Sequence, residues 1–301
     1  MSTALVVIAA VVADAFLGEP RAWHPLAAFG SLAQALERRW NRGEDRRWCG
    51  VGALALLVAG PAAVAGLLAA IPGLGWVVAA VLLYLAIGMR SLSDHAKAIA
   101  GPLARGDLAA ARMAAGRMVS RETTALDERG IARAGIESVL ENGADAVFGA
   151  LFWFVVLGVP GLVAYRLTNT LDAMWGYRTP RYRVFGWAAA RLDDALNWPV
   201  ARLTALTYAL AGETRMGLSC WRSQGPRWKS PNAGVVMAAG AGALGVALGG
   251  PAQYHGRVEE RPALGFGVEP GAADLRRAVA LVRRGLIGWI AVILLGDAFL
   301  A

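Results

Sequence analysis

The chain has 301 residues, a formal net charge of +8 and a hydrophobic fraction of 56%, above the about 45–50% that is usual for soluble domains. It contains uncharged stretches of membrane-spanning length, which are typical of an integral membrane protein rather than a soluble one. Its two cysteines and three histidines do not form a zinc-ligand pattern. No Walker A, GxSxG or HExxH motif is present, which excludes the sites that these motifs build.

Two apolar stretches in the N-terminal third predict a transmembrane hairpin. Residues 51–71 carry no charge and are long enough to cross the hydrocarbon core of a bilayer, and residues 74–89 form a second apolar stretch. The Pro-Gly pair between them favours a tight turn, so the predicted hairpin extends over 51–89. Residues 233–250 and 286–301 are weaker candidates for spans.

The apolar segment 147–165 affects how many times the chain would cross a membrane. The sequence GVPG at 158–161 interrupts it, and proline removes a helical hydrogen bond while glycine favours a turn. Each of the two pieces is too short to cross a bilayer alone. We therefore expect a re-entrant or buried helical hairpin here, with a kinked full span as the alternative.

The polar blocks between the apolar stretches predict helices rather than strands, because regular alternation of polar and apolar residues is absent. Residues 94–119 predict two short amphipathic helices that are separated at the Gly101-Pro102 pair. Residues 127–147 predict a longer helix, with Asp127 as its N-terminal cap.

The fold class that these patterns predict is all-α: a polytopic integral membrane helical protein with amphipathic and re-entrant helices. No low-complexity linker and no internal repeat divides the chain. We therefore expect a single integrated membrane domain over 1–301, with the active-site region at 90–232. All but two of the 30 basic residues are arginine, which suits phosphate or carboxylate ligands or loops on the cytoplasmic face of a membrane.

Three carboxylates share one face of the predicted helix in the sequence GIESVLENGADAV. Glu137, Glu141 and Asp145 lie at i, i+4 and i+8, a spacing at which like charges repel. They border the apolar stripe of the helix, and desolvated carboxylates need partners. Arg133 is one candidate partner for Glu137, and Mg²⁺, which prefers oxygen ligands, is a candidate for the group. The alternative is a solvated face with arginine pairs.

Two shorter polar segments carry candidate ligands. The segment SRETTALDE offers Arg121 and Glu122 in a polar loop beside a substrate, or else a plain helix cap. The segment SPNAG precedes an apolar helix, and its Ser230 and Asn232 are residue types that cap helices. Either these residues only cap the helix, or its free N–H groups face an anion.

The loop GYRTPRYR lies within the densest group of polar residues, at 165–204. Glycine and proline fix the loop, which presents Arg178, Arg181 and Tyr182 together with a third arginine. Arginines so closely spaced suit a polyphosphate or a rim of carboxylates.

Two helical segments flank this loop and carry further polar side chains. The first places Asn169 and Asp172 on one face. The second carries an arginine, an Asp-Asp pair and an asparagine at helical spacing: Arg191, Asp193, Asp194 and Asn197. We expect Pro199 to end this helix and to start the one that carries Arg202. Adjacent aspartates often ligate the Mg²⁺ that accompanies a bound phosphate group. The alternative is a protein surface on which these arginines and aspartates pair with one another.

Four stretches in a fixed order make the chain recognisable: FLGEPRAWHPLAAFG, SRETTALDE followed by RAGIESVLENGADAVFGALFW, NTLDAMWGYRTPRYRVFGWAAARLDDALNWPVARLT, and SPNAGVVMAAGAGALGVALGGPAQY. The chain resembles the adenosylcobinamide-phosphate synthase family (CobD/CbiB) of cobalamin biosynthesis over essentially its whole length. The block at 169–204 is the most specific part of this resemblance.

The resemblance implies an integral membrane enzyme that joins a corrinoid carboxylic acid to an amine. The implied acid is adenosylcobyric acid, through its f-propionate, and the implied amine is (R)-1-amino-2-propanol or its O-phosphate. ATP is the implied co-substrate and Mg²⁺ the implied metal. A carboxylate does not acylate an amine at neutral pH, whereas an acyl phosphate does. Phosphoryl transfer of this kind depends mainly on positioning and on neutralisation of charge.

This chemistry needs carboxylates for Mg²⁺, arginines for phosphate and a base for the proton of the amine. The candidate catalytic residues are Glu122, Asp172 and Asp194. The candidate Mg²⁺ ligands are Glu137, Glu141, Asp145, Asp193 and Asp194. The candidate substrate- and phosphate-binding residues are Arg121, Asn142, Asn169, Arg178, Arg181, Tyr182, Arg191, Asn197, Arg202, Ser230 and Asn232.

The implied partners are the corrinoid substrate, the aminopropanol or its phosphate, and the lipid bilayer. Association with the threonine-phosphate decarboxylase or other cobalamin-pathway enzymes is a further expectation, and no nucleic acid is expected. The expected location is the inner (cytoplasmic) membrane, with several crossings and the active site facing the cytoplasm. Two alternatives stay open: a non-enzymatic membrane sensor and a transporter for an anionic solute.

Overall fold

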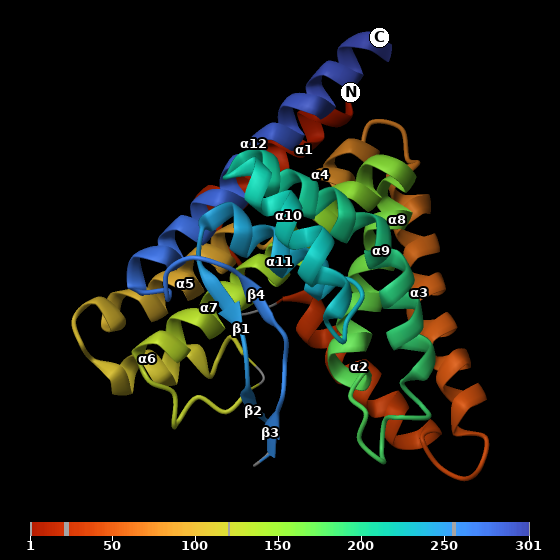
Figure 1. The fold of residues 1–301 in the computed structure, drawn as a ribbon. Coiled ribbons are helices and arrows are strands. Elements are labelled where there is room, and N and C mark those ends of the chain that lie inside the picture. Colours follow the sequence, from red (N-terminus) through yellow and green to blue (C-terminus); the bar gives the residue numbers. More distant parts are fainter. Residues whose placement is uncertain (1, 21–23, 120, 255–256, 301) are drawn as a thin grey trace. The chain divides into compact units, whose positions relative to one another are not determined.

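The structure is a computed structural model, and it describes residues 2–20, 24–119, 121–254 and 257–300. Part of the N-terminal FLGEPRAWHPLAAFG stretch, residues 21–23, lies outside the described residues. Within the described ranges, regular structure is helical apart from four strands of three residues each. The predicted all-α class is therefore confirmed (Figure 1).

The chain divides into two compact units. The first consists of residues 1–88, 145–197 and 293–301, and the second of residues 89–144 and 198–292. Helices α9 (Trp187–Ala211) and α12 (Ala272–Leu300) contribute to both. The expectation of one integrated domain stays a prediction.

The first unit contains six further helical elements: α1 (Thr3–Leu17), α2 (Pro25–Trp40), α3 (Arg46–Ala69), α4 (Gly75–Ala86), the π-helical turn η1 (Ala144–Phe148) and α8 (Gly149–Trp175). A turn with Gly73 at a φ of 76° joins α3 to α4. The two ends of the chain lie side by side, because the N–H of Ala4 donates a 2.6 Å hydrogen bond to Asp297 (Figure 1). A carboxylate at a helix N-terminus satisfies an otherwise unpaired donor.

The chain folds back on itself at Gly158, inside α8. This glycine has a φ of 64° and a ψ of −152°, which divides α8 into two helical limbs. The hydroxyl oxygen of Tyr165 lies 3.1 Å from the carbonyl oxygen of Asp145, twenty positions away. A straight helix would hold these residues about 30 Å apart. The predicted fold-back into a helical hairpin is therefore confirmed, while its re-entrant rather than membrane-crossing character stays a prediction.

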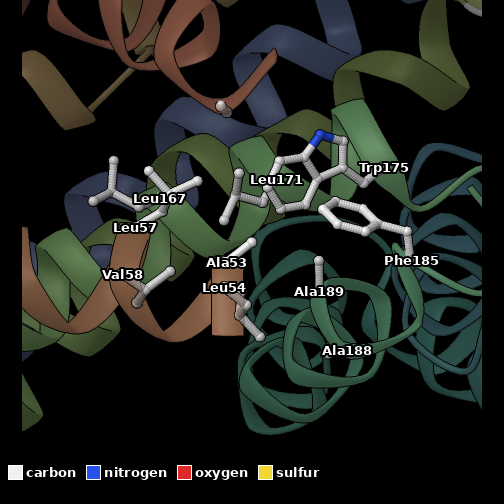
Figure 2. Close-up of a cluster of buried hydrophobic side chains, with 11 residues drawn as sticks. Ala53, Leu54, Leu57, Val58, Leu167, Leu171, Trp175, Phe185, Ala188 and Ala189 are labelled. Carbon is white, nitrogen blue, oxygen red and sulfur yellow. The ribbon is translucent and has the colours of Figure 1, made fainter. Parts of the chain in front are cut away.

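A buried apolar cluster joins α3 to the second limb of α8 and to the start of α9 (Figure 2). The indole of Trp175 meets the ring of Phe185 edge-on, with 5.0 Å between the centroids. Because these two aromatic residues stand at the two ends of the loop that contains GYRTPRYR, their packing fixes both ends of that loop. Ala188 and Ala189 allow α9 to approach the cluster closely.

The second unit contains helical elements and short strands: α5 (Met89–Ala104), α6 (Leu108–Ala115), α7 (Glu128–Gly143), α10 (Thr214–Gln224), the 3-10 turn η2 (Gly225–Arg227), α11 (Ala233–Leu244), β1 (Ala247–Gly249), β2 (Ala252–Tyr254), β3 (Arg257–Glu259) and β4 (Ala263–Gly265). Strand β1 pairs antiparallel with β4, and β2 with β3. Helix α11 packs against α10 (Figure 1). The predicted cap of α7 is confirmed, because Asp127 accepts a 2.7 Å hydrogen bond from the N–H of Gly130.

Two predicted helix ends are wrong. Helix α5 continues through Pro102 to Ala104, and the chain turns at Gly106, where φ is 76°. Helix α9 continues through Pro199, so Arg202 lies on the same helix as Asp193. A proline removes one helical hydrogen bond but keeps φ near the helical value, so the rest of the helix can persist around it.

Among the described residues, four helical stretches are long and apolar enough to cross a membrane: Arg46–Ala69, Gly75–Ala104, Glu128–Trp175 and Ala272–Phe299. The third contains the fold-back at Gly158, and the fourth includes most of the weaker candidate at 286–301. The other weak candidate is not a span, because α11 has only 12 residues. These stretches indicate a multi-pass membrane protein.

Candidate active site

The first unit holds a group of hydrogen-bonded polar side chains, which we call the Asp193 cluster: Tyr165, Asn169, Asp193 and Asn197. The amide of Asn169 donates to Oδ1 of Asp193 over 3.3 Å, and the amide of Asn197 donates to Oδ2 over 3.0 Å. The hydroxyl of Tyr165 completes the cluster, 2.8 Å from Oδ1 of Asn197. Both carboxylate oxygens of Asp193 therefore have a donor.

Helical spacing produces this cluster. Tyr165 and Asn169 lie four residues apart on the second limb of α8, and Asp193 and Asn197 lie four residues apart on α9. Residues at this spacing share a face of a helix. The two pairs face each other, and Asn197 is 5% exposed. Because buried polar groups need partners, the cluster fixes the contact between these two segments.

The pKa of Asp193 lies above its ordinary value. Burial is the largest cause, and the neighbouring charge of Asp194 adds to it, while the amides of Asn197 and Asn169 act in the opposite direction. A carboxylate in such a setting is suited to accept a proton or to ligate a cation. Asp194 itself is half-buried and pairs with Arg191 over 3.4 Å, a separation typical of a weak surface pair.

The π-helical turn η1 brings Asp145 to the same cluster. The carbonyl oxygen of Asp145 lies 3.1 Å from the hydroxyl of Tyr165. Gly149 packs directly on the ring of Tyr165, where any Cβ would collide with that ring. Single π-turns inside helices occur often at functional sites. Of the predicted acidic face, Glu137 therefore lies in the α-helix α7, whereas Asp145 lies in the π-helical turn.

The second unit holds a buried ion triad, which we call the Glu137 triad: Arg121, Glu137 and Arg261. Oε2 of Glu137 pairs with Arg121 and, over 3.1 Å, with Arg261. Glu137 is 2% exposed, and each arginine side chain is 9% exposed. Two cations around one anion leave a net positive charge, and buried charges persist only when they are paired and hydrogen-bonded.

A backbone donor completes the Glu137 triad. The N–H of Gly249 donates a 2.8 Å hydrogen bond to Oε1 of Glu137. Gly249 has a φ of 73°, and a Cβ there would collide with the carbonyl oxygen of Pro262, so only glycine suits this position. Arg133, the partner expected from spacing, pairs instead with Glu269 over 2.5 Å.

Arg202 and Asn232 meet in the second unit. A guanidinium N–H of Arg202 donates to Oδ1 of Asn232 over 2.7 Å, and the guanidinium lies 4.7 Å from the centre of the Trp198 ring. Burial lowers the pKa of Arg202. Ser230, rather than Asn232, caps α11, because its hydroxyl accepts from the N–H of Ala233 over 3.1 Å. The side chain of Asn232 is thus engaged by the arginine.

The GYRTPRYR loop directs its arginines differently from one another. Arg181 makes a bidentate pair with Glu37, with distances of 2.9 and 2.7 Å. Arg178 is exposed. Tyr182 lies under the guanidinium of Arg181, 5.5 Å from ring centre to carbon. Arg181 is thus paired with an acid, whereas no pairing with an acid is described for Arg178.

The remaining candidates lie on the two units as follows. Asn142 bonds to Ser138 within its own helix, over 2.8 and 2.9 Å, and Glu141 beside it is exposed. The backbone N–H of Glu122 donates to the carbonyl of Gln253 over 3.0 Å. Asp172 lies on α8 one turn beyond Asn169.

Comparisons with known proteins show which family the chain belongs to. The family described as CobD/CbiB protein matches residues 7–282. The chain is 57% identical over 298 residues to "Cobalamin biosynthesis protein CobD" of Stutzerimonas stutzeri, covering 98% of each chain. It is 56% identical over 299 residues to the protein of the same name from Chromobacterium violaceum, covering 97% of this chain and 96% of the other. The chain belongs to the CobD/CbiB family.

More distant CobD/CbiB relatives also align over most of their length. The Mycobacterium tuberculosis protein of the same name is 44% identical over 277 residues, covering 90% of this chain and 88% of the other. No solved structure matches the chain. The resemblance inferred from motifs is thus confirmed at the level of the family.

The described acids of this CobD/CbiB protein do not form a magnesium site from side chains alone. Within the described ranges, no three His, Cys, Asp or Glu side chains lie close enough together to hold a metal ion. Magnesium is usually held by one or two carboxylates together with substrate phosphates. Asp193 and Asp194 fit that arrangement, because the donors to Asp193 are neutral amides that leave its charge free for a cation, whereas two arginines already neutralise Glu137.

Sequence reasoning missed three residues of these sites. Tyr165 lies four residues before Asn169, and this spacing could have placed it beside the asparagine. Arg261 and Glu37 gave no such signal, because each meets its partner across more than 100 residues of chain.

Proposed function

We propose that the chain is an ATP-dependent amide ligase of adenosylcobalamin biosynthesis. It attaches (R)-1-amino-2-propanol or its O-phosphate to the f-propionate of adenosylcobyric acid. Support comes from near-full-length similarity to proteins named cobalamin biosynthesis protein CobD and from membership of the CobD/CbiB family.

The Asp193 cluster is the observation that carries the proposal for the site. It holds a carboxylate in a fixed geometry beside a second, half-buried carboxylate, Asp194. We assign the pair to the Mg²⁺ of a magnesium nucleotide, and the metal neutralises charge on the phosphates when it is bound. Arg178 and Arg191, which are exposed in the same unit, are assigned to phosphate oxygens.

The proposed reaction has two balanced steps. An oxygen of the f-propionate attacks the γ-phosphorus of ATP, the bond from that phosphorus to ADP breaks, and an acyl phosphate forms. The nitrogen of the amine then attacks the acyl carbon, the bond from that carbon to phosphate oxygen breaks, and the amide forms. The proton of the amine passes to a carboxylate. Asp172 is our candidate base in the first unit, and Glu122 is the alternative in the second.

The second unit offers its own groups for an anionic part of a substrate. Arg202 is held by Asn232 and Trp198, and Arg121 is held by Glu137. An arginine that is already oriented loses less side-chain entropy when it binds a ligand. We assign them to carboxylate or phosphate groups of the substrates.

We place the protein in the inner membrane with its nucleotide site toward the cytoplasm, where ATP is available and arginine-rich loops are favoured. Association with the threonine-phosphate decarboxylase, which would supply the amine, is part of the same proposal.

The test uses the purified full chain in lipid nanodiscs with Mg-ATP, the amine and adenosylcobyric acid. We expect ADP release that requires both substrates, and a corrinoid product with the mass of the amide. Asp193→Asn should lower this rate at least about a hundredfold, because it weakens the charge neutralisation at the transferred phosphoryl group, while Asp94→Asn, at an exposed surface pair, should not change it. Folded protein that releases no ADP would contradict the ligase and favour a sensor. Solute uptake into proteoliposomes without ATP turnover would favour a transporter.

A further inference from the structure

The first unit has an arginine-lined cavity of about 410 Å³ between the end of α2, the start of α3 and the GYRTPRYR loop. Five charged residues and one asparagine line it: Glu37, Arg38, Asn41, Arg42, Arg46 and Arg181. Four arginines and one glutamate give this lining a net charge of +3. We call it the arginine cavity.

The single acid of the arginine cavity is already neutralised. Glu37 is 1% exposed and accepts two hydrogen bonds from Arg181 and one from Asn41. Burial alone would raise the pKa of Glu37, but the bonds from Arg181 and Asn41 outweigh it, and the pKa lies below its ordinary value. Glu37 is therefore an anion that holds Arg181 and Asn41 by hydrogen bonds and also attracts Arg38, but its single negative charge does not balance four arginines.

The other three arginines of the cavity are not paired with an acid in the way that Arg181 is. No ion pair or hydrogen bond joins the side chains of Arg38, Arg42 or Arg46 to any residue that the structure describes. Glu44 and Asp45 lie in the same loop but do not line the cavity. Cationic side chains gathered in one cavity repel each other, so an anionic ligand would stabilise them.

The cavity stands where a candidate membrane span begins. The stretch Arg46–Ala69 starts at one of the lining arginines. Trp40 and Trp48, on either side, are 38% and 74% exposed, and the guanidinium of Arg47 lies 4.0 Å from the centre of the Trp187 ring. Exposed tryptophans together with arginines at the end of a span are typical of the membrane–water interface.

We propose that the arginine cavity binds a phosphate group. Its place at the start of a span suits the headgroup of an anionic phospholipid, and a soluble phosphorylated compound offers the same chemistry. Arg181 is held in place by its two hydrogen bonds to Glu37. Arg38, Arg42 and Arg46 bind the phosphate oxygens. This binding does not depend on the ligase activity proposed above.

The test measures binding to the purified full chain in detergent by the rise in its melting temperature, because a ligand that binds the folded state stabilises it. One arm adds phosphatidylglycerol or phosphatidylcholine in mixed micelles. A second arm adds inorganic phosphate or pyrophosphate against KCl of equal ionic strength. The compared proteins are the unchanged chain, the double variant Arg38→Gln/Arg42→Gln, and Arg39→Gln. The last is the matched control, because Arg39 is on the same helix but does not line the cavity.

We expect phosphatidylglycerol, and not phosphatidylcholine, to stabilise the unchanged chain and Arg39→Gln. The double variant should bind at least about tenfold more weakly, since each arginine near an anionic surface contributes several-fold to affinity. Arg38→Lys/Arg42→Lys should recover part of the binding and so show that charge is the cause. Stabilisation by phosphate or pyrophosphate alone would support the cavity with a soluble ligand. Equal responses of the double variant and Arg39→Gln to every ligand would overturn the proposal.

Discussion

The hydroxyl oxygen of Tyr165 lies 2.8 Å from Oδ1 of Asn197 and 3.1 Å from the carbonyl oxygen of Asp145. One side chain thus links the π-helical turn, the second limb of α8 and α9. Tyr165 is 1% exposed and Asn197 is 5% exposed, so the amide oxygen of Asn197 has little access to water if the hydroxyl of Tyr165 is lost.

Tyr165→Phe should therefore destabilise the first unit. Removal of one partner from a buried hydrogen bond costs about 1–3 kcal/mol. Thermal unfolding in detergent should show a lower melting temperature, and Tyr177→Phe, at a side chain that is 49% exposed, should leave it unchanged. Equal melting temperatures for the two variants would show that the Tyr165 bonds do not contribute to stability.

Glu137→Gln should be among the most destabilising single changes in the second unit. It removes the only described acid between Arg121 and Arg261, and breaking a buried ion pair costs about 3–5 kcal/mol. The comparison is Glu259→Gln, which breaks the exposed pair with Lys229 and should cost at most about 1 kcal/mol. A loss for Glu137→Gln as small as that of Glu259→Gln would mean that the triad is hydrated.

Two glycines with similar positive φ angles should respond differently to alanine. Gly249 has a φ of 73° and no room for a Cβ, whereas Gly245 has a φ of 68° and open space around it. Gly245→Ala should cost about 1–2 kcal/mol from backbone strain alone. Gly249→Ala should cost clearly more in chemical unfolding, because strand β1 must also move away from Pro262 and from Glu137. An equal loss of unfolding free energy in the two variants would contradict the crowding at Gly249.

Asp193 should make the first unit less stable as the pH rises. Because its pKa in the folded state is raised above the ordinary 3.8, the folded chain keeps this proton at pH values where the unfolded chain has lost it. The stabilisation is full below 3.8 and is lost as the pH rises through the raised pKa. The melting temperature of the unchanged chain relative to Asp193→Asn should therefore fall over that range. A rise would reverse the assigned direction.

Glu37 should make the first unit less stable as the pH falls. Its pKa is lowered from the ordinary 4.5, so its stabilisation is present above that value and is lost as the pH falls through the lowered pKa. The stability difference between the unchanged chain and Glu37→Gln should shrink on acidification. Its persistence at low pH would mean that packing of the side chain, and not its charge, supports Arg181.

Local patterns in the sequence were enough for the helical class, the Asp127 cap and the fold-back near GVPG. Each depends on neighbours along the chain: hydropathy over a window, a capping side chain, and a glycine with a proline inside an apolar run. Pro102 and Pro199 gave the wrong helix ends, because a proline alone does not decide whether the residues around it continue the helix.

Pairing between distant residues was decided only by the tertiary structure. Glu137 is bound by Arg261 from 124 positions away, and the acid that holds Arg181 is 144 positions away. The acidic face at Glu137, Glu141 and Asp145 followed from helical spacing, but a π-helical turn changes its register before the third acid. Spacing specifies which side chains share a face, whereas packing between segments decides which opposite charge, amide or backbone N–H each of them meets.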